Sequence, residues 1–224
     1  MLKCDFHLHT RCRNDDLNYT AKDLIKYASR LGYDVLSITN HNCRTYDHVK
    51  NYAKKLGILL IPGVEVNLGR KHVIVLNSKH NSDVKSSNEL EKLKQEGAFL
   101  IAPHPFFPHP SSMRMEFFIK HKHLFDALEY SFFYTKNINF NNKMIEVGKK
   151  YHIPVVANSD LHGLDNLDRI FTMIDADKNI DSVLEAIKKN KIKIHTEPLS
   201  FYRFVKIGLK VFLAETLGMK LKPS

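Results

Sequence analysis

Two short motifs near opposite ends of the chain combine histidine with aspartate. The first, D-x-H-x-H, places Asp5, His7 and His9 two residues apart, so in an extended strand the three side chains point to the same face. The second, D-L-H, repeats this spacing with Asp160 and His162. A buried strand ordinarily fills such a face with aliphatic side chains, so these motifs indicate either solvent or a bound cation.

Other imidazoles and carboxylates follow short apolar runs along the chain. The segments I-T-N-H, P-G-V-E, K-H-V-I-V-L, A-P-H-P and L-E-Y contribute His41, Glu65, His72, His104 and Glu129. Neutral imidazole and carboxylate are ligands that Zn²⁺, Mn²⁺ and Fe²⁺ accept. Because each unpaired buried ion loses much hydration free energy, burial of this set predicts a site for two or three divalent metal ions.

Alternating strand and helix patterns would position these residues. Apolar runs predict strands at residues 3–7, 35–39, 58–62, 72–76, 99–102, 127–130, 154–157 and 171–174. Helical spacing predicts helices at 20–31, 47–56, 86–96, 137–151 and 180–190. We expect Thr20 to be an N-cap, and Ser86 with Glu89 to form a capping box. This alternation predicts a parallel sheet or barrel with outer helices, in which residues that follow the strands meet at one end.

Composition favours a single globular domain. The chain has 224 residues, of which 43% are hydrophobic and 26% charged, without a linker that divides it. We find neither an export signal nor an apolar run of the ~18 residues that a membrane span needs. Three cysteines without a C-x-x-C pair argue against a disulfide framework. These features predict a cytoplasmic protein.

The net charge of +10 suits an anionic substrate or nucleic acid, although solvated lysines would give the same balance.

Taken in order, these motifs resemble those of the polymerase and histidinol phosphatase (PHP) superfamily. The resemblance covers roughly residues 2–200. It implies a distorted (β/α)7 barrel with two or three divalent metal ions, of Zn, Mn or Fe, at the C-terminal ends of the strands. It also implies hydrolysis of phosphate esters, since the superfamily includes histidinol phosphatases, nucleotide phosphatases, nucleases acting on short nucleic acids, and domains of DNA polymerases.

The resemblance also implies a set of metal ligands. A first ion would be held by His7, His9, Glu65 and Asp160. A second ion, to which Glu65 bridges, would be held by His72 and His104. A third ion would be held by His41, His162 and a carboxylate from the loop T-R-C-R-N-D-D.

Two positions depart from the usual family pattern. In the loop after the first strand, the first candidate position for the ligand is Asn14, so we expect Asp15 to bind the third ion, with Asp16 as the alternative. I-T-N-H stands in place of the usual I-T-D-H, and Asn40 cannot supply charge. We expect Asn40 to act as a hydrogen-bonding partner behind the ligands; a weakened third site or a slower reaction is the alternative.

The resemblance further implies in-line attack on phosphorus by a metal-bridging hydroxide. His41, His162 or a water at the third site would protonate the leaving alkoxide. Arg169, in L-D-R-I-F-T, would bind phosphate oxygens through its guanidinium, with a surface salt bridge as its alternative role. Arg11 and Arg13, beside the metal loop, are further phosphate-binding candidates.

The last segment, 201–224, predicts an amphipathic basic helix. Its Arg203, Lys206 and Lys210 fall on one helical face. We expect the helix to dock on the domain formed by residues 1–200; a homodimer contact or a membrane-surface helix is the alternative.

These observations leave several functions open. The leading hypothesis is a metal-dependent phosphatase that hydrolyses a small phosphomonoester, either a nucleotide or a metabolite phosphate. A nuclease that trims short RNA or DNA is the alternative, supported by the charge and by aromatic residues that could stack on bases, namely Phe106, Phe107, Phe132, Phe133 and Tyr134. A catalytically weakened binding module is a third hypothesis. A metal-dependent amidohydrolase shares the H-x-H motif but usually has a bridging lysine where this chain has Glu65.

Overall fold

The computed structural model describes the chain except residues 14, 16, 110 and 218–224, and it describes residues 210–217 by their backbone alone. Its strands are β1 (Leu2–Leu8), β2 (Val35–Ile38), β3 (Leu59–Leu60), β4 (Gly63–Leu68), β5 (Lys71–Leu76), β6 (Phe99–Ala102), β7 (Ala127–Ser131), β8 (Val155–Asn158), β9 (Ile170–Ile174) and β10 (Ile192–Thr196). Its α-helices are α1 (Ala21–Arg30), α2 (Tyr46–Lys55), α3 (Ser87–Gln95), α4 (Met115–His121), α5 (Asn141–Tyr151), α6 (Ile180–Lys188) and α7 (Phe201–Leu217).

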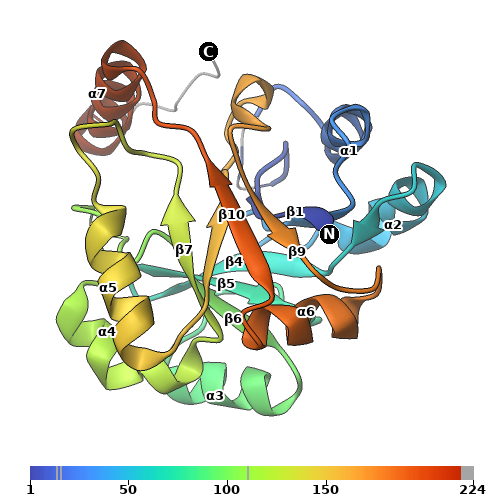
Figure 1. Ribbon diagram of the computed structural model, residues 1–224, viewed down its shortest axis with the longest axis horizontal. Coiled ribbons are helices and arrows are strands. Elements are labelled where there is room, and N and C mark those ends of the chain that lie inside the picture. The colour runs from blue at the N-terminus through green and yellow to red at the C-terminus, as the bar shows by residue number, and fades with distance from the viewer. Residues whose placement is uncertain (14, 16, 110, 218–224) are drawn as a thin grey trace.

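The strands form two five-stranded mixed sheets, in the orders β10-β9-β1-β2-β3 and β4-β5-β6-β7-β8 (Figure 1). In the first sheet, β9 is antiparallel to both β1 and β10. In the second, β5 is antiparallel to both β4 and β6, whereas β6, β7 and β8 are parallel. The predicted parallel sheet is therefore confirmed only in part, because each sheet combines parallel and antiparallel pairs. The two strands that sequence patterns missed, β4 and β10, each form an antiparallel pair with a predicted strand.

The two sheets meet at isolated bridges. One joins Leu8 to Leu161, and the other joins His41 to Glu65. Close approach at the second bridge requires Gly63, because a Cβ there would clash with Ser37 and lie 2.9 Å from Thr39 Cγ2. Among the described strands the ladders do not continue from β3 to β4 or from β8 to β10. The fold is thus α/β with mixed sheets, and closure into a barrel is not confirmed.

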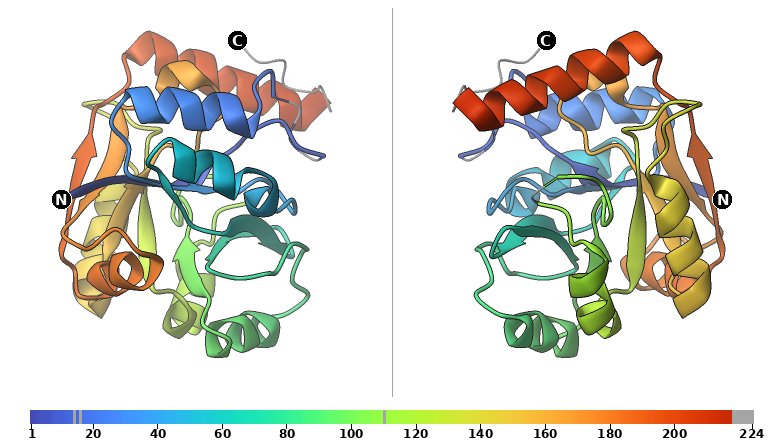
Figure 2. Two further views of the ribbon diagram at one scale, coloured as in Figure 1. Left: turned by 90° about the vertical axis from the view of Figure 1, so that its right-hand side faces the viewer. Right: turned by 90° about the vertical axis from the view of Figure 1, so that its left-hand side faces the viewer.

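A hydrophobic cluster holds the two sheets together. Phe6 on β1 packs with Ile74, Leu76 and Phe99 from the second sheet, and all four side chains are almost completely buried. Helices lie on the outer sides of the strands, with α7 at one end of the molecule and α3 at the other (Figure 2). This core fixes β1 relative to β4 and β5, which carry the residues of interest.

Local sequence signals determine where the helices begin. Thr20 caps α1 as predicted, and Asp23 completes a capping box, since its backbone N–H donates to Thr20 Oγ1 and its carboxylate accepts from the Thr20 N–H at 2.9 Å. The capping box predicted at Ser86 does not form. Glu89 instead accepts the backbone N–H of Lys85 at 3.0 Å. Helix α5 begins at Asn141, four residues later than the pattern predicts, and α4 was not predicted.

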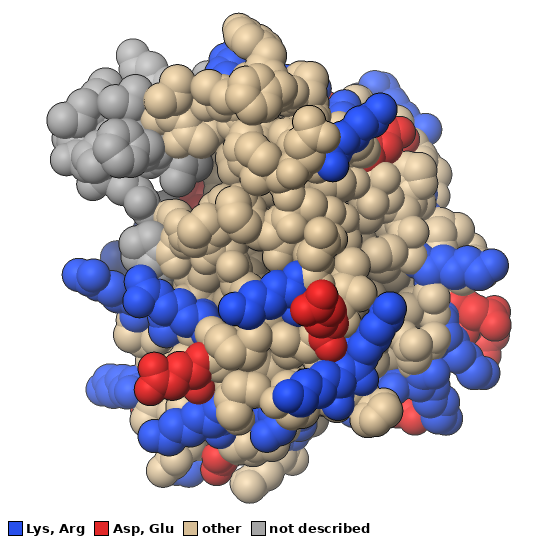
Figure 3. Space-filling view, turned by 60° about the vertical axis from the view of Figure 1, so that its left-hand side comes forward, with Lys and Arg blue, Asp and Glu red and all other residues tan. Residues whose placement is uncertain are grey.

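Helix α7 spans the first part of the predicted C-terminal helix. The ring of Phe204 stacks on Phe133 with centroids 4.3 Å apart, and the Arg203 guanidinium lies 2.6 Å from an Asp165 oxygen. In the part of the chain that the structure describes, no helix is long and apolar enough to cross a membrane. Figure 3 shows one face of the molecule, where Lys and Arg predominate among the charged side chains over the lower half.

The two N-caps provide a matched test of local stability. Thr20→Ala removes a capping side chain that accepts a hydrogen bond, so it should lower the free energy of unfolding by about 1 kcal/mol. Ser86→Ala removes a capping hydroxyl without such a bond and should change it by less than about 0.5 kcal/mol. Urea unfolding of the two variants measures the difference. Equal losses would mean that the capping box at α1 does not stabilise the fold.

Candidate metal centre

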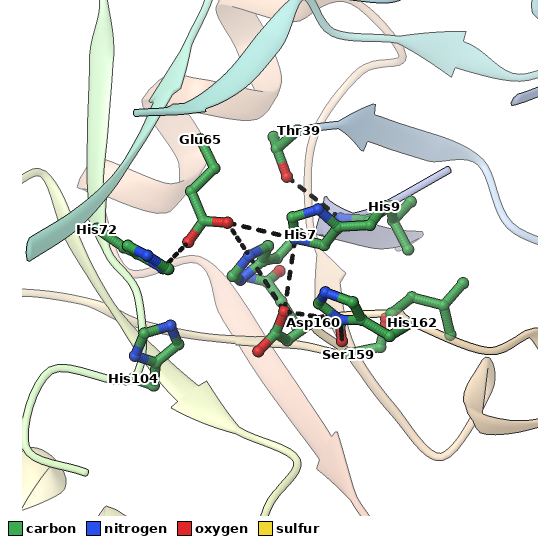
Figure 4. Close-up of polar contacts among 12 residues, drawn as sticks. His7, His9, Thr39, Glu65, His72, His104, Ser159, Asp160 and His162 are labelled. Atoms are coloured by element: carbon green, nitrogen blue, oxygen red, sulfur yellow. Dashed lines mark hydrogen bonds and ion pairs between the residues drawn. The ribbon is translucent and has the colours of Figure 1, made fainter. Parts of the chain in front are cut away.

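Four side chains from three segments of the chain, at the ends of β1 and β8 and on β4, converge on one point (Figure 4). Glu65 Oε2, from β4, lies 3.3 Å from Nε2 of both His7 and His9. Asp160, which follows β8, places Oδ1 3.4 Å from His7 Nε2 and 3.5 Å from His9 Nε2. The structure therefore brings together all four residues of the predicted first set.

The predicted second set also gathers around Glu65. His72 Nδ1 lies 2.8 Å from Glu65 Oε1, and the ring centroid of His104 is 5.7 Å from that of His72. His72 stands at the beginning of β5 and not at its end. It still reaches the site because β5 runs antiparallel to β4, so the start of β5 lies at the same edge as Glu65. His41 Nδ1 lies 3.1 Å from Glu65 Oε2 and joins this set.

The third set forms where the loops after β1 and β2 meet. Asp15 Oδ2 accepts the backbone N–H of His41 at 2.8 Å, and Asp15 Oδ1 lies 3.5 Å from His9 Nδ1. The His162 ring lies 4.4 Å from that of His9. His9, Asp15, His41 and His162 offer ligand atoms that all lie within 4.8 Å of one another. Asp15 thus occupies the place expected of the loop ligand, whereas Asp16 and Asn14 lie outside the described residues.

Burial makes the charges in this group depend on one another. His7, His9 and Glu65 are essentially inaccessible to solvent. Burial alone would raise the pKa of Glu65, but His7, His72 and His41 hold that pKa well below its ordinary value. Burial alone would lower the pKa of His7, but Glu129, Asp160 and Glu65 raise it well above its ordinary value. The carboxylates therefore create a strongly negative potential that favours positive charge.

The donor set fits divalent cations. His7 Nε2 and both ring nitrogens of His9 are buried and have no hydrogen-bond partner among the described residues. Such atoms are costly to leave unpaired. Imidazole nitrogens mixed with carboxylate oxygens match the preferences of zinc, manganese and iron. His162 is exposed, so the group is open to solvent on that side.

Glu129 orients the buried histidine, a role that sequence analysis did not assign to it. His7 Nδ1 donates to Glu129 Oε1 at 2.8 Å, and Asn158 Nδ2 donates to the same oxygen at 3.0 Å. The other oxygen, Oε2, accepts the backbone N–H of His104 at 2.9 Å. With Nδ1 bonded in this way, Nε2 of His7 is directed toward Glu65 and Asp160. Carboxylates that hold ligating histidines typically act so.

Asn40 lies behind the ligands in a network of neutral hydrogen bonds. Its Oδ1 accepts the Thr10 N–H at 2.6 Å, and its Nδ2 donates to the Thr10 and Thr45 hydroxyls at 3.0 and 2.8 Å. These bonds support the expected hydrogen-bonding role, because each polar atom of the amide has a partner. The Asn40 side chain thereby holds Thr10, where the loop T-R-C-R-N-D-D begins, against the segment that follows β2.

Of the predicted phosphate-binding arginines, Arg169 contacts residues outside the converging group. Arg169 Nη2 donates to the Pro198 carbonyl at 3.1 Å and lies 3.8 Å from Glu197 Oε2. These contacts match the salt-bridge alternative and tie β9 to the segment before α7. Arg11 and Arg13 are exposed.

Cys12 and Cys43 form a disulfide, whereas Cys4 is free and buried. The cysteine count had argued against disulfide bonding, so that prediction is wrong. The pairing arises because the loops after two neighbouring parallel strands, β1 and β2, extend from the same edge of the sheet. A separation of 31 residues gives no sign of this in the sequence.

Comparison with known proteins agrees with this fold. A family model described as the PHP domain matches residues 5–131, and one described as PHP-associated matches residues 139–192. An uncharacterized protein of Methanocaldococcus jannaschii is 28% identical over 119 residues, which cover 48% of this chain and 70% of that protein.

Two solved structures share the fold. One is a two-domain protein of Bacteroides vulgatus that contains a predicted PHP-like metal-dependent phosphoesterase, with a TM-score of 0.71, 20% identity, and coverage of 92% of this chain and 68% of that chain. The other is a lesion-specific endonuclease of Pyrococcus furiosus, with a TM-score of 0.61, 15% identity, and coverage of 92% and 66%.

The α/β fold carries a group of imidazoles and carboxylates that could hold metal ions. Since the PHP-domain match extends over more than half of the sequence, the chain belongs to the PHP domain family.

Replacing Glu129 tests its orienting role. In Glu129→Gln, one acceptor oxygen becomes an NH₂ group that faces an N–H donor, so the His7 ring or the His104 backbone loses its partner. We expect affinity for Mn²⁺ or Zn²⁺ to fall by about 10–100-fold, measured by competition with a chelating dye. Glu91→Gln, which alters an exposed carboxylate 3.3 Å from His123, should leave affinity unchanged. An unaltered affinity in Glu129→Gln would contradict the role.

Proposed function

We propose that this protein is a metal-dependent phosphoesterase that hydrolyses a small phosphomonoester, either a nucleotide or a metabolite phosphate. The observation that carries the proposal is the convergence of imidazoles and carboxylates whose ligand atoms lie within 4.8 Å of one another, at a point where His7 Nε2 and both ring nitrogens of His9 are buried without hydrogen-bond partners among the described residues. Membership of the PHP family supports the reaction class.

We propose that two or three ions of zinc, manganese or iron bind to His7, His9, Asp15, His41, Glu65, His72, His104, Asp160 and His162. Divalent cations at such a site lower the pKa of bound water toward ~7 and offset charge on a phosphoryl group. Glu65 is placed to serve two neighbouring ions, because its two oxygens face different histidines.

The protonation of the outer histidines favours ligand roles over acid catalysis. Burial is the main cause that lowers the pKa of His41 to about 4, so this imidazole is neutral at pH 7. His162 Nδ1 lies 2.9 Å from the Asp160 carbonyl oxygen and donates to it, which leaves Nε2 with a free lone pair. Neutral rings with a free lone pair suit cation binding, whereas protonation of the leaving group would require an imidazolium.

A pocket beside His104 supports a small substrate. Its volume is about 380 Å³, at the lower end of the range for small-molecule sites. It is lined by Phe106, Phe107, Arg114 and Lys143, among others. Its loop is tied to the metal group, since Phe107 N–H donates to the His104 carbonyl at 3.2 Å. The positively charged side chains of Arg114 and Lys143 offer contacts for an anionic group of the substrate.

A nuclease acting on short RNA or DNA is the second candidate. The net charge of +10 favours it, and one structure with a similar fold is an endonuclease. Most of the rings proposed for base stacking are used in packing, however. Phe133 contacts Phe107 and Phe204, and Tyr134 is buried. Phe106 and Phe107 line the small pocket, but Phe106 also packs on Phe118 and Phe107 on Phe133 and Phe140. Little aromatic surface therefore remains for stacking, which favours a short substrate.

Two architectural proposals accompany this function. We propose that the two sheets together form the distorted barrel typical of the family, supported by the two bridges that join one sheet to the other. We also propose that α7 docks on the domain through Phe204 and Arg203. Exposed Phe201, Tyr202 and Leu209 leave an apolar face that would suit a homodimer contact.

Metal removal tests the leading proposal. Protein treated with a chelator should lose hydrolysis of p-nitrophenyl phosphate and of mononucleotides, and added Mn²⁺ or Zn²⁺ should restore it. His9→Ala and Asp160→Ala should reduce metal-dependent turnover by at least about 10³-fold, because each removes a ligand. His48→Ala, which alters an exposed histidine on α2, is the control. Undiminished turnover in either ligand variant would refute the assignment.

Salt dependence separates the phosphatase from the nuclease. A small phosphomonoester makes few ionic contacts, so its KM should change little between low and high salt. An oligonucleotide that contacts several cations should lose affinity steeply, with a logarithmic slope of about 0.7 per phosphate contact. Steady-state kinetics on a mononucleotide and on a short single strand measure both. Preference for the strand, with a steep slope, would favour the nuclease.

A further inference from the structure

The Cys12–Cys43 disulfide joins the two loops that build the third ligand set. Cys12 lies in the loop between β1 and α1, three residues before Asp15, and Cys43 lies two residues after His41. The Cα atoms of the two cysteines are 6.7 Å apart. Both residues are only partly buried, so a small thiol or disulfide reagent can reach the bond.

The position of Cys12 sets the position of Asp15. Cys12 N–H donates to the Asp15 carbonyl at 2.9 Å, and Asp15 N–H donates back to the Cys12 carbonyl at 3.2 Å. These two bonds couple the backbones of Cys12 and Asp15, so displacement of Cys12 displaces the carboxylate that faces His9 and His41. Beyond this turn, the loop is held by the bond from Arg11 N–H to the Tyr19 carbonyl at 2.8 Å.

The position of Cys43 is fixed in turn by the framework. Cys43 N–H donates to the Asn40 carbonyl at 3.4 Å, and the neighbouring Asn42 N–H donates to the Glu65 carbonyl at 2.9 Å. The disulfide therefore connects a loop of irregular structure to a segment that is anchored on β4. The Asp15 carboxylate also contacts the segment of Cys43 directly, because it accepts the His41 N–H at 2.8 Å and lies 3.8 Å from His41 Nε2.

We propose that the Cys12–Cys43 disulfide is a thiol-sensitive positioning device for the third cation. In the oxidised protein it holds Asp15 against His41, His9 and His162, and in the reduced protein Asp15 is released and the third cation binds more weakly. The inference rests on the proposed function for its effect on turnover. Its effect on cation binding does not depend on which substrate the protein takes.

The redox step balances with a low-molecular-weight disulfide as oxidant. The two cysteine thiols give up two electrons and two protons as the S–S bond forms. The reagent RSSR accepts them, its own S–S bond breaks, and two RSH molecules are released. A thiol in excess reverses the exchange. The proposal therefore predicts cation binding that follows the ratio of RSSR to RSH.

The experiment compares oxidised and reduced protein with Mn²⁺ as the probe. The protein is equilibrated with glutathione disulfide or with a phosphine reductant, free thiols are counted by mass spectrometry after alkylation, and Mn²⁺ binding is measured by equilibrium dialysis. We expect reduction to weaken the weakest class of Mn²⁺ sites by about 10-fold or more. Hydrogen exchange of the peptide that contains Cys12 and Asp15 should accelerate at the same time.

Variants separate positioning from general stability. The double variant Cys12→Ser/Cys43→Ser should bind Mn²⁺ like the reduced protein and should not respond to either reagent. Cys4→Ala, which removes the buried free thiol, should respond like the unaltered chain. Raising free Mn²⁺ should restore turnover in the double variant, because the defect is in affinity and not in the reaction itself.

Three results would overturn the proposal. They are equal Mn²⁺ binding by the oxidised and reduced proteins, two alkylated thiols at positions 12 and 43 after glutathione disulfide treatment, and a double variant that loses only thermal stability. Absence of phosphoester hydrolysis in both redox states would instead refute the proposed function. The difference in Mn²⁺ binding would still decide the role of the disulfide.

Discussion

The cost of removing carboxylates and imidazoles from water is the constraint on which the whole arrangement depends. Glu65 is buried among His7, His9, His41 and His72, and a lone carboxylate there would be strongly destabilising. The histidines offset this cost only if their lone pairs and protons are correctly directed. The surrounding fold therefore has to fix ring orientation as well as position, and cations complete the balance of charge.

Backbone geometry brings the carboxylate to that point. Gly63 has no side chain, so β4 can approach β2 closely enough for Glu65 to bridge to His41. The antiparallel pairing of β4 with β5 then returns the chain so that His72 lies at the same edge. A purely parallel arrangement would have placed the start of β5 at the far end of the sheet. The mixed direction of the strands is thus a requirement of the site.

Much of the site was predictable because its signals are local. His7 and His9 are two residues apart, as are Asp160 and His162, and in an extended chain this spacing directs both side chains of a pair to the same face. The role of Glu129 was not predictable, since a single acid in an apolar run carries no sign of which histidine it will meet. The Cys12–Cys43 disulfide and the antiparallel strand pairs were also not predicted, because each depends on pairing between separate segments of the chain. Capping shows the same limit, as Thr20 caps its helix while Ser86, with an equally good pattern, does not.

Glu129 serves two ligand groups with one carboxylate. One oxygen fixes the ring of His7, and the other fixes the backbone at His104. Occupation of either neighbouring position stiffens the same side chain and so reduces the conformational entropy that remains to be lost at the other. A change at Glu129 therefore alters the surroundings of His7 and of His104 together, so the two positions cannot be adjusted separately through this carboxylate.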